Sequence, residues 1–281
     1  MKIAVIADIH SNFRALEAVA EHIDRWQADQ VIVAGDVVNR GPMPLPCFQF
    51  VKTKQQSQKW EVLRGNHEDY VLEHLTVKRD IKGVEFEIYR MSHWTFAQLG
   101  ETVTELGKLP FHLTQTAPDD SKIRITHASM RHIRDSMIVD APETLLMSQI
   151  GLPLPGLFCS GHTHLPFVRK LHNTCVVNVG SVGMPFDRDT RAGYAQLTWH
   201  NSEWQAKIVR VEYDRAATRR DFYESGYLDE AGALSPLVFD EFEKGCSHLF
   251  RWNENYRAPV MRGEMSLEES VKAHLKSHGG Y

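Results

Sequence analysis

The sequence of 281 residues predicts one large α/β domain followed by a helical C-terminal segment. Short apolar runs alternate with helical patterns in the first part of the chain, which is typical of βαβ units with parallel strands. From residue 111 to residue 211, short apolar runs are separated by turns, so we expect a second sheet with more antiparallel pairing. After residue 213, the apolar side chains return to helical spacing.

The N-terminal part predicts buried strands joined by helices. Ile3–Ala7 is a continuous apolar run, typical of a strand that is covered on both faces. Apolar residues recur at helical spacing over 13–26, with Asn12 or Ser11 as the N-cap. Further strands are predicted at Val31–Ala34 and Trp60–Leu63, with a helix after Pro42 and a helical stretch over 67–107.

The middle of the chain predicts a series of short strands. They are expected at Phe111–Thr114, Ile123–Thr126, Leu157–Cys159, Phe167–Leu171, Cys175–Val179, Tyr194–Trp199 and Ala206–Val211. The last two form a predicted hairpin that turns at Asn201 and Ser202. Ser266–Lys276 predicts a final amphipathic helix. We therefore expect a domain over 1–212 and a helical extension over 213–281 that packs on the same domain.

Composition excludes several classes of protein. The formal charge is −4, from 32 basic and 36 acidic residues, so no large nucleic-acid footprint is expected. The four cysteines are widely spaced and form no C-x-x-C pair, which argues against a disulfide framework and a thiolate zinc site. The start has no signal-peptide pattern, and no run approaches the ~20 apolar residues of a membrane span. We expect a cytoplasmic protein that does not contact a membrane; its oligomeric state is not indicated.

Polar clusters follow five of the predicted strands. In open α/β sheets, ligands bind outside the carboxyl ends of the strands, so we expect the five loops to converge. In an extended backbone, the i, i+2 pairs Asp8/His10 and His162/His164 share a face, and both members of a pair can reach one centre. The five clusters are Asp8-Ile9-His10, Gly35-Asp36, Gly65-Asn66-His67-Glu68, His127 and Gly161-His162-Thr163-His164.

The converging side chains predict a metal centre. Mixed oxygen and imidazole donors suit Mn, Fe, Zn, Co or Ni better than Ca or Mg, and we favour Mn or Fe. Seven ligands exceed one tetrahedral site and suit two divalent transition-metal ions ~3.5–4 Å apart, which clamp the oxygens of a phosphoryl displacement. A carboxylate such as Asp36 is the natural bridge. The seven candidates are Asp8, His10, Asp36, Asn66, His127, His162 and His164.

These motifs together resemble the signature of the calcineurin-like metallophosphoesterases. Five blocks occur in the family's order between residues 8 and 164: Asp8-x-His10, Gly35-Asp36-x-x-Asn39-Arg40-Gly41, Gly65-Asn66-His67-Glu68, His127 and Gly161-His162-x-His164. The stretch from Asn178 through Gly180 to Tyr194 is similar to the closing part of bacterial phosphoesterases of this family. The rest of the C-terminal segment matches no pattern of the family.

The resemblance implies a four-layer α/β/β/α sandwich and a reaction mechanism. A metal-bridging hydroxide would attack phosphorus in line, His67 would protonate the leaving oxygen as the general acid, and Arg40 would neutralise charge on the phosphoryl oxygens. The resemblance also assigns the ligands. One metal ion would be held by Asp8, His10 and His164, the other by Asn66, His127 and His162, with Asp36 as the bridge.

One position departs from the protein phosphatases of the superfamily. They carry Asp where this chain has Asn39, and that Asp pairs with the general-acid histidine. Asn cannot stabilise an imidazolium by charge, so Glu68 and Asp69 are the candidates for an ionised partner of His67. The block from Gly35 to Pro42 also resembles symmetrical diadenosine tetraphosphate hydrolases, whereas Arg64 to Glu68 matches the protein phosphatases.

We therefore interpret the chain as a metal-dependent hydrolase of phosphate esters, a phosphodiesterase or phosphatase with a small or nucleotide-like substrate. A serine/threonine protein phosphatase and a diadenosine polyphosphate hydrolase are the alternatives among enzymes. A catalytically silent metal-binding scaffold is the alternative of another class, and the intact His67 argues against it. Outside the site, we expect a structural ion pair for Arg64, a solvated loop for Arg188 and Arg191, and surface positions for helical histidines such as His248 and His274. The C-terminal aromatic residues are expected to form a core or a lid.

Overall fold

A computed structural model describes residues 1–78 and 80–278 of the chain. Its strands are β1 (Lys2–Ile6), β2 (Gln30–Val33), β3 (Glu61–Val62), β4 (His112–Thr116), β5 (Lys122–Thr126), β6 (Leu157–Ser160), β7 (Phe167–Leu171), β8 (Thr174–Asn178), β9 (Ala192–His200) and β10 (Glu203–Val211). Its helices are α1 (Phe13–Trp26), α2 (Pro44–Gln58), α3 (Asn66–Leu72), α4 (Val84–Leu99), α5 (Val103–Leu106), α6 (Glu143–Ile150), α7 (Arg215–Glu224), α8 (Tyr227–Glu230), α9 (Ser235–Lys244), α10 (Leu249–Asn255), α11 (Arg257–Met261) and α12 (Leu267–His278), with short 3-10 turns η1 (Glu73–Leu75) and η2 (Gly100–Thr102). Within these two ranges, no helix is both long and apolar enough to cross a membrane.

The strands form two five-stranded sheets with the orders β10-β9-β1-β2-β3 and β4-β5-β6-β8-β7. In the first sheet, β1, β2 and β3 are parallel, and the β9–β10 hairpin adds antiparallel strands next to β1. In the second sheet, β5, β6 and β8 are parallel, and β4 and β7 are antiparallel edges. The expectation of a more antiparallel second sheet is therefore wrong. Each sheet has two parallel and two antiparallel pairings. Helical crossovers allow parallel pairing in both sheets, as α6 does between β5 and β6.

The two sheets pack face to face over an apolar core. On β1, Ile3 and Val5 face this core, whereas Ala4 and Ile6 face the helices on the other side. Successive side chains of a strand point to opposite faces, so a continuous apolar run covers both faces. The second sheet contributes Ile123, Ile125, Leu157, Cys159 and Val177 to the same core.

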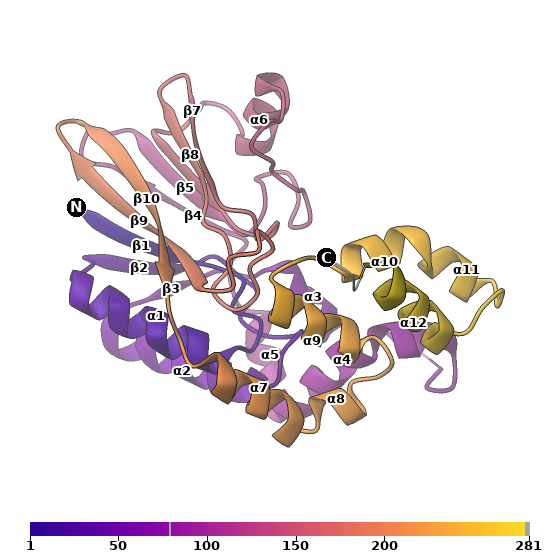
Figure 1. The fold of residues 1–281 in the computed structure, drawn as a ribbon. Coiled ribbons are helices and arrows are strands. Elements are labelled where there is room, and N and C mark those ends of the chain that lie inside the picture. The colour runs from indigo at the N-terminus through magenta and orange to yellow at the C-terminus, as the bar shows by residue number, and fades with distance from the viewer. Residues whose placement is uncertain (79, 279–281) are drawn as a thin grey trace.

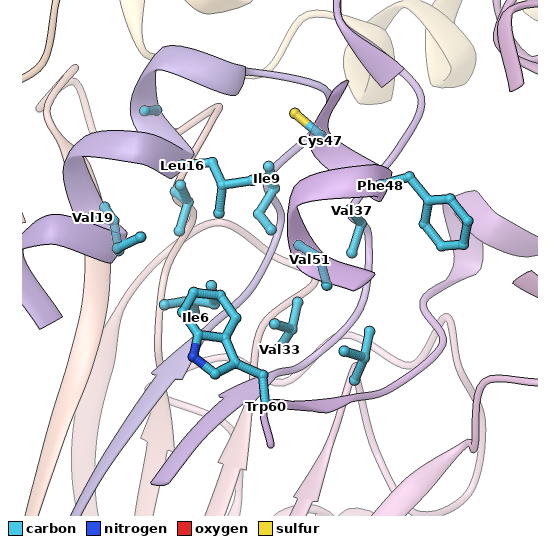
Figure 2. Packing of buried hydrophobic residues seen from close by; sticks show 14 of the residues in the cluster. Ile6, Ile9, Leu16, Val19, Val33, Val37, Cys47, Phe48, Val51 and Trp60 are labelled. Carbon is cyan, nitrogen blue, oxygen red and sulfur yellow. The ribbon is translucent and has the colours of Figure 1, made fainter. Parts of the chain in front are cut away.

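Helices α1 and α2 cover the outer face of the first sheet (Figure 1). In Figure 2, Leu16 of α1 lies with Ile6 of β1 and with Trp60, the residue before β3, in this apolar layer. Helix α1 begins after Asn12, whose side chain accepts a hydrogen bond from the N–H of Ala15 at 3.2 Å. This N-cap fixes the point at which the chain leaves the end of β1 and turns into the helix.

Helix α6 lies on the outer face of the second sheet (Figure 1). Its residues Leu146 and Ile150 share an apolar cluster with Phe158 of β6 and Val176 of β8. Helices therefore flank the two packed sheets on both sides. This order of layers confirms the predicted α/β/β/α sandwich.

The C-terminal helices α7–α12 lie beside α4 at one end of the sandwich (Figure 1). Phe222 and Trp252 belong to their apolar core, which also takes in Trp94 of α4 and Met184 from the loop after β8. Because this core joins residues from both parts of the chain, the C-terminal helices are held against the edge of the sandwich where the parallel strands end.

Two C-terminal histidines that we expected at the surface are buried. His248 is 2% exposed and His274 is 0% exposed. Nδ1 of His248 lies 3.0 Å from Nε2 of His274, and Nε2 of His248 lies 2.7 Å from a carboxylate oxygen of Asp240. The expectation was wrong because helical spacing along one segment does not show which face a neighbouring helix covers.

Candidate metal centre

Five loops bring the predicted polar residues together where the parallel strands end. Asp8 follows β1, Asp36 follows β2, Asn66 opens α3 after β3, His127 follows β5 and His164 follows β6. Six of the seven candidate ligands are buried, and the seventh, at position 162, is half-buried. The parallel register of the two sheets therefore places residues more than 150 positions apart in one buried cluster.

The backbone of this cluster is left-handed, not extended as we expected. The φ angles are 54° at Asp8, 47° at His10, 69° at His162 and 59° at His164. Residues other than glycine rarely adopt this conformation, which costs about 1–3 kcal/mol and occurs at functional sites. As a result, the two histidines of the last block point to different partners. His164 faces His10, with ring centroids 4.9 Å apart, and His162 faces His127, with ring centroids 5.1 Å apart.

Three histidine rings are oriented by backbone carbonyl groups. Nδ1 lies 3.3 Å from a carbonyl oxygen in His10, 2.9 Å in His127 and 2.5 Å in His164. Each Nδ1–H therefore donates to a carbonyl oxygen, and each Nε2 faces the centre of the cluster. This arrangement is typical of metal-binding histidines. The three carbonyl groups belong to Asn39, Ala34 and Met184, respectively.

Among the described residues, no lysine or arginine pairs with the carboxylate of Asp8. Nε2 of His10 lies 3.1 Å from Nε2 of His164, and Oδ1 of Asp8 lies 3.3 Å from the latter atom. Oδ1 of Asp8 is buried and has no hydrogen-bond partner among the described residues. Two lone pairs and a carboxylate oxygen in such proximity repel one another, and an unpaired buried carboxylate is costly. The donor set at this point therefore fits a bound metal ion.

Asp36 lies between two groups of histidines. Its Oδ2 is 3.7 Å from Nε2 of His10 on one side and 3.3 Å from Nε2 of His127 on the other. Its Oδ1 accepts a hydrogen bond from the backbone N–H of His67 at 2.8 Å. The carboxylate is thus held with one oxygen anchored to the protein and the other directed into the cluster, as a bridge between two cations requires.

The second group of candidate ligands lies on the far side of Asp36. Oδ1 of Asn66 is 2.9 Å from Nε2 of His127, and the ring of His162 stands edge-on to that of His127. An amide oxygen and two imidazoles are donors that suit a divalent transition metal. The structure therefore brings all seven predicted ligands into one cluster with two halves.

The buried carboxylate and imidazoles of the cluster shift one another's pKa values. Burial favours protonated Asp36, but the neighbouring His127 and His67 hold the pKa of its carboxyl well below the usual range. Burial also opposes protonation of His127, yet the charge of Asp36 and a hydrogen bond to it raise the pKa of this imidazole to about 10. Burial, followed by the charge of His127, lowers the pKa of His162 to about 4. The carboxylate of Asp36 thus stabilises positive charge beside it. A metal ion bound there would compete with the proton for Nε2 of His127.

The proposed general acid, His67, has an amide partner. Nδ1 of His67 lies 2.8 Å from Nδ2 of Asn39, whose Oδ1 accepts the N–H of Arg40 at 2.9 Å. This bond fixes the amide, so Nδ2 donates to Nδ1 and the ring proton of neutral His67 lies on Nε2. Nε2 is directed to the cluster, 4.0 Å from Oδ2 of Asp36. Burial lowers the pKa of His67 well below its usual value.

Neither of the two candidates for an ionised partner of His67 contacts it. Asp69 instead lies 3.2 Å from Nε of Arg64, which confirms the structural ion pair predicted for that arginine. Glu68 points away, into the backbone of the neighbouring loop. The first residues of a helix project in different directions, so proximity in sequence does not place these carboxylates beside the imidazole.

Glu68 has a structural role that the sequence did not reveal. Its carboxylate accepts hydrogen bonds from the backbone N–H groups of Asp36, Val37, Val38 and Gly65, at 2.7–3.2 Å. Burial, together with the charge of Asp36, raises the pKa of Glu68 to about 7, and the backbone donors oppose this shift by favouring the ionised form. The side chain joins the loop after β2 to the start of α3. Gly65 is required here, because a Cβ at this position would collide with the carboxylate of Asp36.

A cavity of ≈ 830 Å³ opens from the metal centre toward the C-terminal helices. Arg40 lines it, close to the candidate ligands, and has a left-handed backbone with φ 61°. Arg188 and Arg191 lie on an exposed loop, as expected. Arg191 pairs with Asp189, whereas Arg188 also lines the cavity, a position that the sequence did not predict.

The site and the fold together define the class of the protein. Residues 1–202 match the calcineurin-like phosphoesterase superfamily domain, and the chain belongs to this family. The predicted family is therefore confirmed, and so is the prediction of a hydrolase that acts on phosphoester bonds. The family and the clustered His and Asp side chains indicate divalent metal binding.

Comparison with known proteins supports this assignment. An uncharacterized protein of Methanocaldococcus jannaschii is 28% identical over 230 residues, which cover 75% of this chain and 88% of that protein. The crystal structure of a metallophosphoesterase from Sphaerobacter thermophilus has a TM-score of 0.67 and 25% identity, and the match covers 87% of this chain and 99% of that one. A symmetrical bis(5'-nucleosyl)-tetraphosphatase of Psychromonas ingrahamii is 35% identical over 69 residues, or 24% of each chain.

Proposed function

We propose that the chain is a dinuclear metal-dependent phosphoesterase that cleaves a small or nucleotide-like phosphate ester, as a phosphodiesterase or a phosphatase. One observation carries the proposal. Asp36 directs Oδ2 between Nε2 of His10 and Nε2 of His127, at 3.7 and 3.3 Å, so one carboxylate faces two groups of imidazole nitrogen atoms. A bridge of this kind suits two cations better than one.

The chain's own residues would hold both cations, with Mn or Fe favoured. One cation would be held by Asp8, His10 and His164, the other by Asn66, His127 and His162, and Asp36 would bridge them. When bound, the two cations supply a hydroxide nucleophile at neutral pH for in-line attack on phosphorus. The carbonyl groups behind the histidines keep the Nε2 atoms directed at this point.

Two further residues would act on the substrate itself. His67 directs Nε2 toward the centre. As an imidazolium it would donate the Nε2 proton to the leaving oxygen and remain as a neutral imidazole with its proton on Nδ1. Arg40 lines the cavity beside it and would bind the phosphoryl oxygens, whose negative charge grows in the transition state. Asn39 supports both residues, because its amide orients the imidazole and accepts the backbone N–H of the arginine.

Metal analysis and a substrate panel test the proposal. The purified protein should bind close to two transition-metal ions per chain after anaerobic incubation with Mn²⁺. The panel compares bis-p-nitrophenyl phosphate, p-nitrophenyl phosphate, a cyclic nucleotide, diadenosine tetraphosphate and a phosphopeptide. Turnover of a small ester is the expected result. Failure to bind metal, or full metal loading without turnover of any ester, contradicts the proposal, and the second result points to a metal-binding scaffold.

Diadenosine polyphosphate hydrolysis is the second candidate. It is supported by the similarity to the tetraphosphatase of Psychromonas ingrahamii over 69 residues. The protein-phosphatase alternative has less support, because His67 is paired with the amide of Asn39 and not with a carboxylate. The second candidate is favoured over the first if kcat/KM is higher for diadenosine tetraphosphate than for every other ester of the panel.

A further inference from the structure

The cavity above the metal centre has two walls from different parts of the chain. The sandwich contributes Arg40, His67 and Tyr70, whereas the C-terminal helices contribute Phe250 and Arg251 among others. The match to the family domain ends at residue 202, so the second wall lies outside it. A part of the chain outside the family domain therefore shapes the space in which the substrate would lie.

The cavity is strongly cationic. Its described lining contains only one carboxylate, that of Asp36, which belongs to the metal centre. It also contains five arginines, although the whole chain has a formal charge of −4. Two metal cations and one arginine are enough to bind a single phosphoryl group. The additional arginines therefore favour a ligand that carries more negative charge than one phosphoryl group. The five arginines are Arg40, Arg134, Arg188, Arg251 and Arg257.

Most of these guanidinium groups are not committed to acidic side chains. Within the described parts of the chain, Arg188, Arg251 and Arg257 have no carboxylate within 4.0 Å. The guanidinium of Arg257 is positioned by neutral groups, the hydroxyl oxygen of Tyr89 at 3.4 Å and the amide oxygen of Asn253 at 3.3 Å. Neutral partners orient the side chain but leave its charge uncompensated. An oxyanion is the ligand that such a fork of N–H donors recognises.

A continuous wall connects the proposed general acid to this arginine. The ring of Tyr70 lies 5.2 Å from that of His67, and the ring of Tyr89 lies 6.4 Å from that of Tyr70, measured between centroids. The hydroxyl of Tyr89 then contacts Arg257. Arg257 is therefore two aromatic rings away from the reacting centre, too far to bind the same phosphoryl group as His67.

From this geometry we infer that Arg251 and Arg257 bind a second phosphate group of the substrate. The enzyme then selects small molecules that carry a phosphate beyond the one that is cleaved. The inference rests on the proposed function and deepens it. The volume of ≈ 830 Å³ is that of a small-molecule pocket, and apolar residues such as Ile88 and Leu249 in its lining suit the organic part of the ligand.

Two esters that differ by one phosphate test the inference. Thymidine 5'-(p-nitrophenyl phosphate) and its 3'-phosphorylated derivative are compared as substrates of the Mn²⁺-loaded protein at constant free Mn²⁺. We expect the 3'-phosphate to raise kcat/KM by about tenfold, the effect of charge-assisted hydrogen bonds to an added oxyanion. In Arg251→Gln/Arg257→Gln, the ratio of the two kcat/KM values should fall to about one.

A matched pair of arginines controls for net charge. Arg219 and Arg262 belong to the same C-terminal segment but lie outside the cavity, where they pair with Glu243 and Glu264. Arg219→Gln/Arg262→Gln should keep the ratio of the wild-type protein. Because Arg257 contacts Tyr89, the single variant Arg251→Gln repeats the test at an exposed position, where folding is not at risk.

Calorimetry separates this inference from the proposed function. Thymidine 3',5'-bisphosphate should bind the Mn²⁺-loaded protein about tenfold more tightly than thymidine 5'-phosphate, and the gain should disappear in the double variant. Equal binding of the two nucleotides, or an equal ratio in the variant and the control, overturns the inference and leaves the proposed function intact. The small-molecule assignment is also overturned if a phosphopeptide has a higher kcat/KM than either ester and this value falls in Arg251→Gln/Arg257→Gln. Loss of turnover for both esters with normal binding overturns only the proposed function.

Discussion

At the scale of single residues, the direction of each imidazole determines what the centre can do. A histidine that donates Nδ1–H to a carbonyl group presents an unprotonated Nε2 to its other side. His10, His127 and His164 all donate Nδ1–H in this way, so each can offer Nε2 to a metal ion once that nitrogen is unprotonated. The residue proposed as the acid differs from them. His67 accepts at Nδ1 from Asn39 and therefore carries its proton on Nε2. In the proposed function, one residue type would thus supply both the ligands and the acid, and the hydrogen-bond partner of Nδ1 would set the role.

Replacing the acid should separate metal binding from turnover. In His67→Ala, we expect the metal content to be unchanged and kcat to fall by ~10²–10⁴, the usual contribution of a general acid. Metal analysis and steady-state kinetics on the same preparation measure both. His172→Ala, at an exposed position between β7 and β8, is the matched control and should behave as the wild-type protein. Activity of His67→Ala equal to that of the control would refute the role of this histidine.

Replacing the bridge should affect both metal ions. In Asp36→Asn, Oδ1 can still accept the N–H of His67, but the charge between the two groups of histidines is lost. We expect the occupancy of both metal sites to fall, as measured by elemental analysis after dialysis. Asp140→Asn, at an exposed position, controls for the change in net charge. Loss of only one metal ion would show that Asp36 does not bridge.

At the scale of the elements, one carboxylate determines how β2 and α3 meet. Glu68 satisfies four backbone N–H groups of the loop after β2 and of the residue before α3. Three of these groups belong to the turn that carries Asp36, so the side chain of Glu68 positions the carboxylate that we propose as the bridge through the backbone. Buried backbone donors that lose their acceptor are costly.

Glu68→Gln should therefore destabilise the fold. The amide keeps the size of the side chain but directs an NH₂ group at backbone donors, and we expect the free energy of unfolding to fall by roughly 1–3 kcal/mol. Urea denaturation followed by circular dichroism measures this change. Glu61→Gln, which changes an exposed glutamate of β3, should have almost no effect. Equal midpoints for the two variants would contradict the structural role of Glu68.

At the scale of the whole molecule, the C-terminal helices and the metal centre share a contact. Met184 packs in the apolar core of the C-terminal helices, and its backbone carbonyl accepts the Nδ1–H of His164. The ring of Phe186 stacks on the same imidazole, with centroids 4.2 Å apart. We propose that residues 213–281 are an extension of the 1–212 domain, not an independent unit.

A substitution in this distant core tests the proposal. Trp252 is 2% exposed and donates Nε1–H to Ser270 at 2.9 Å, so Trp252→Ala should lower the free energy of unfolding by ~3–5 kcal/mol. Phe250→Ala is the control on the same helix, because Phe250 is 64% exposed and should change stability by about 0.5 kcal/mol or less. Circular dichroism and tryptophan fluorescence should report coincident transitions for the wild-type chain. Two separate transitions would instead show two independent units.

Much of the fold was predictable because its signals are local. Apolar runs such as Ile3–Ala7 show burial on both faces, and the spacing of apolar residues over 13–26 locates the first helix with its cap at Asn12. The balance of parallel and antiparallel pairing in the second sheet was not predictable, because strand order depends on contacts between distant segments. The prediction of surface positions for His248 and His274 was wrong for the same reason, because both side chains are buried.

The sequence by itself determined which donors are present and where the chain places them, since residue types and strand ends are local properties. Only the tertiary structure decided how these donors are used. Left-handed turns send His162 and His164 to different halves of the centre, and Glu68 supports a loop instead of the acid. The arginines at positions 251 and 257 join the cavity from a segment without family motifs. Side-chain direction and long-range packing cause these differences, and neither is encoded in the spacing of residues along the chain.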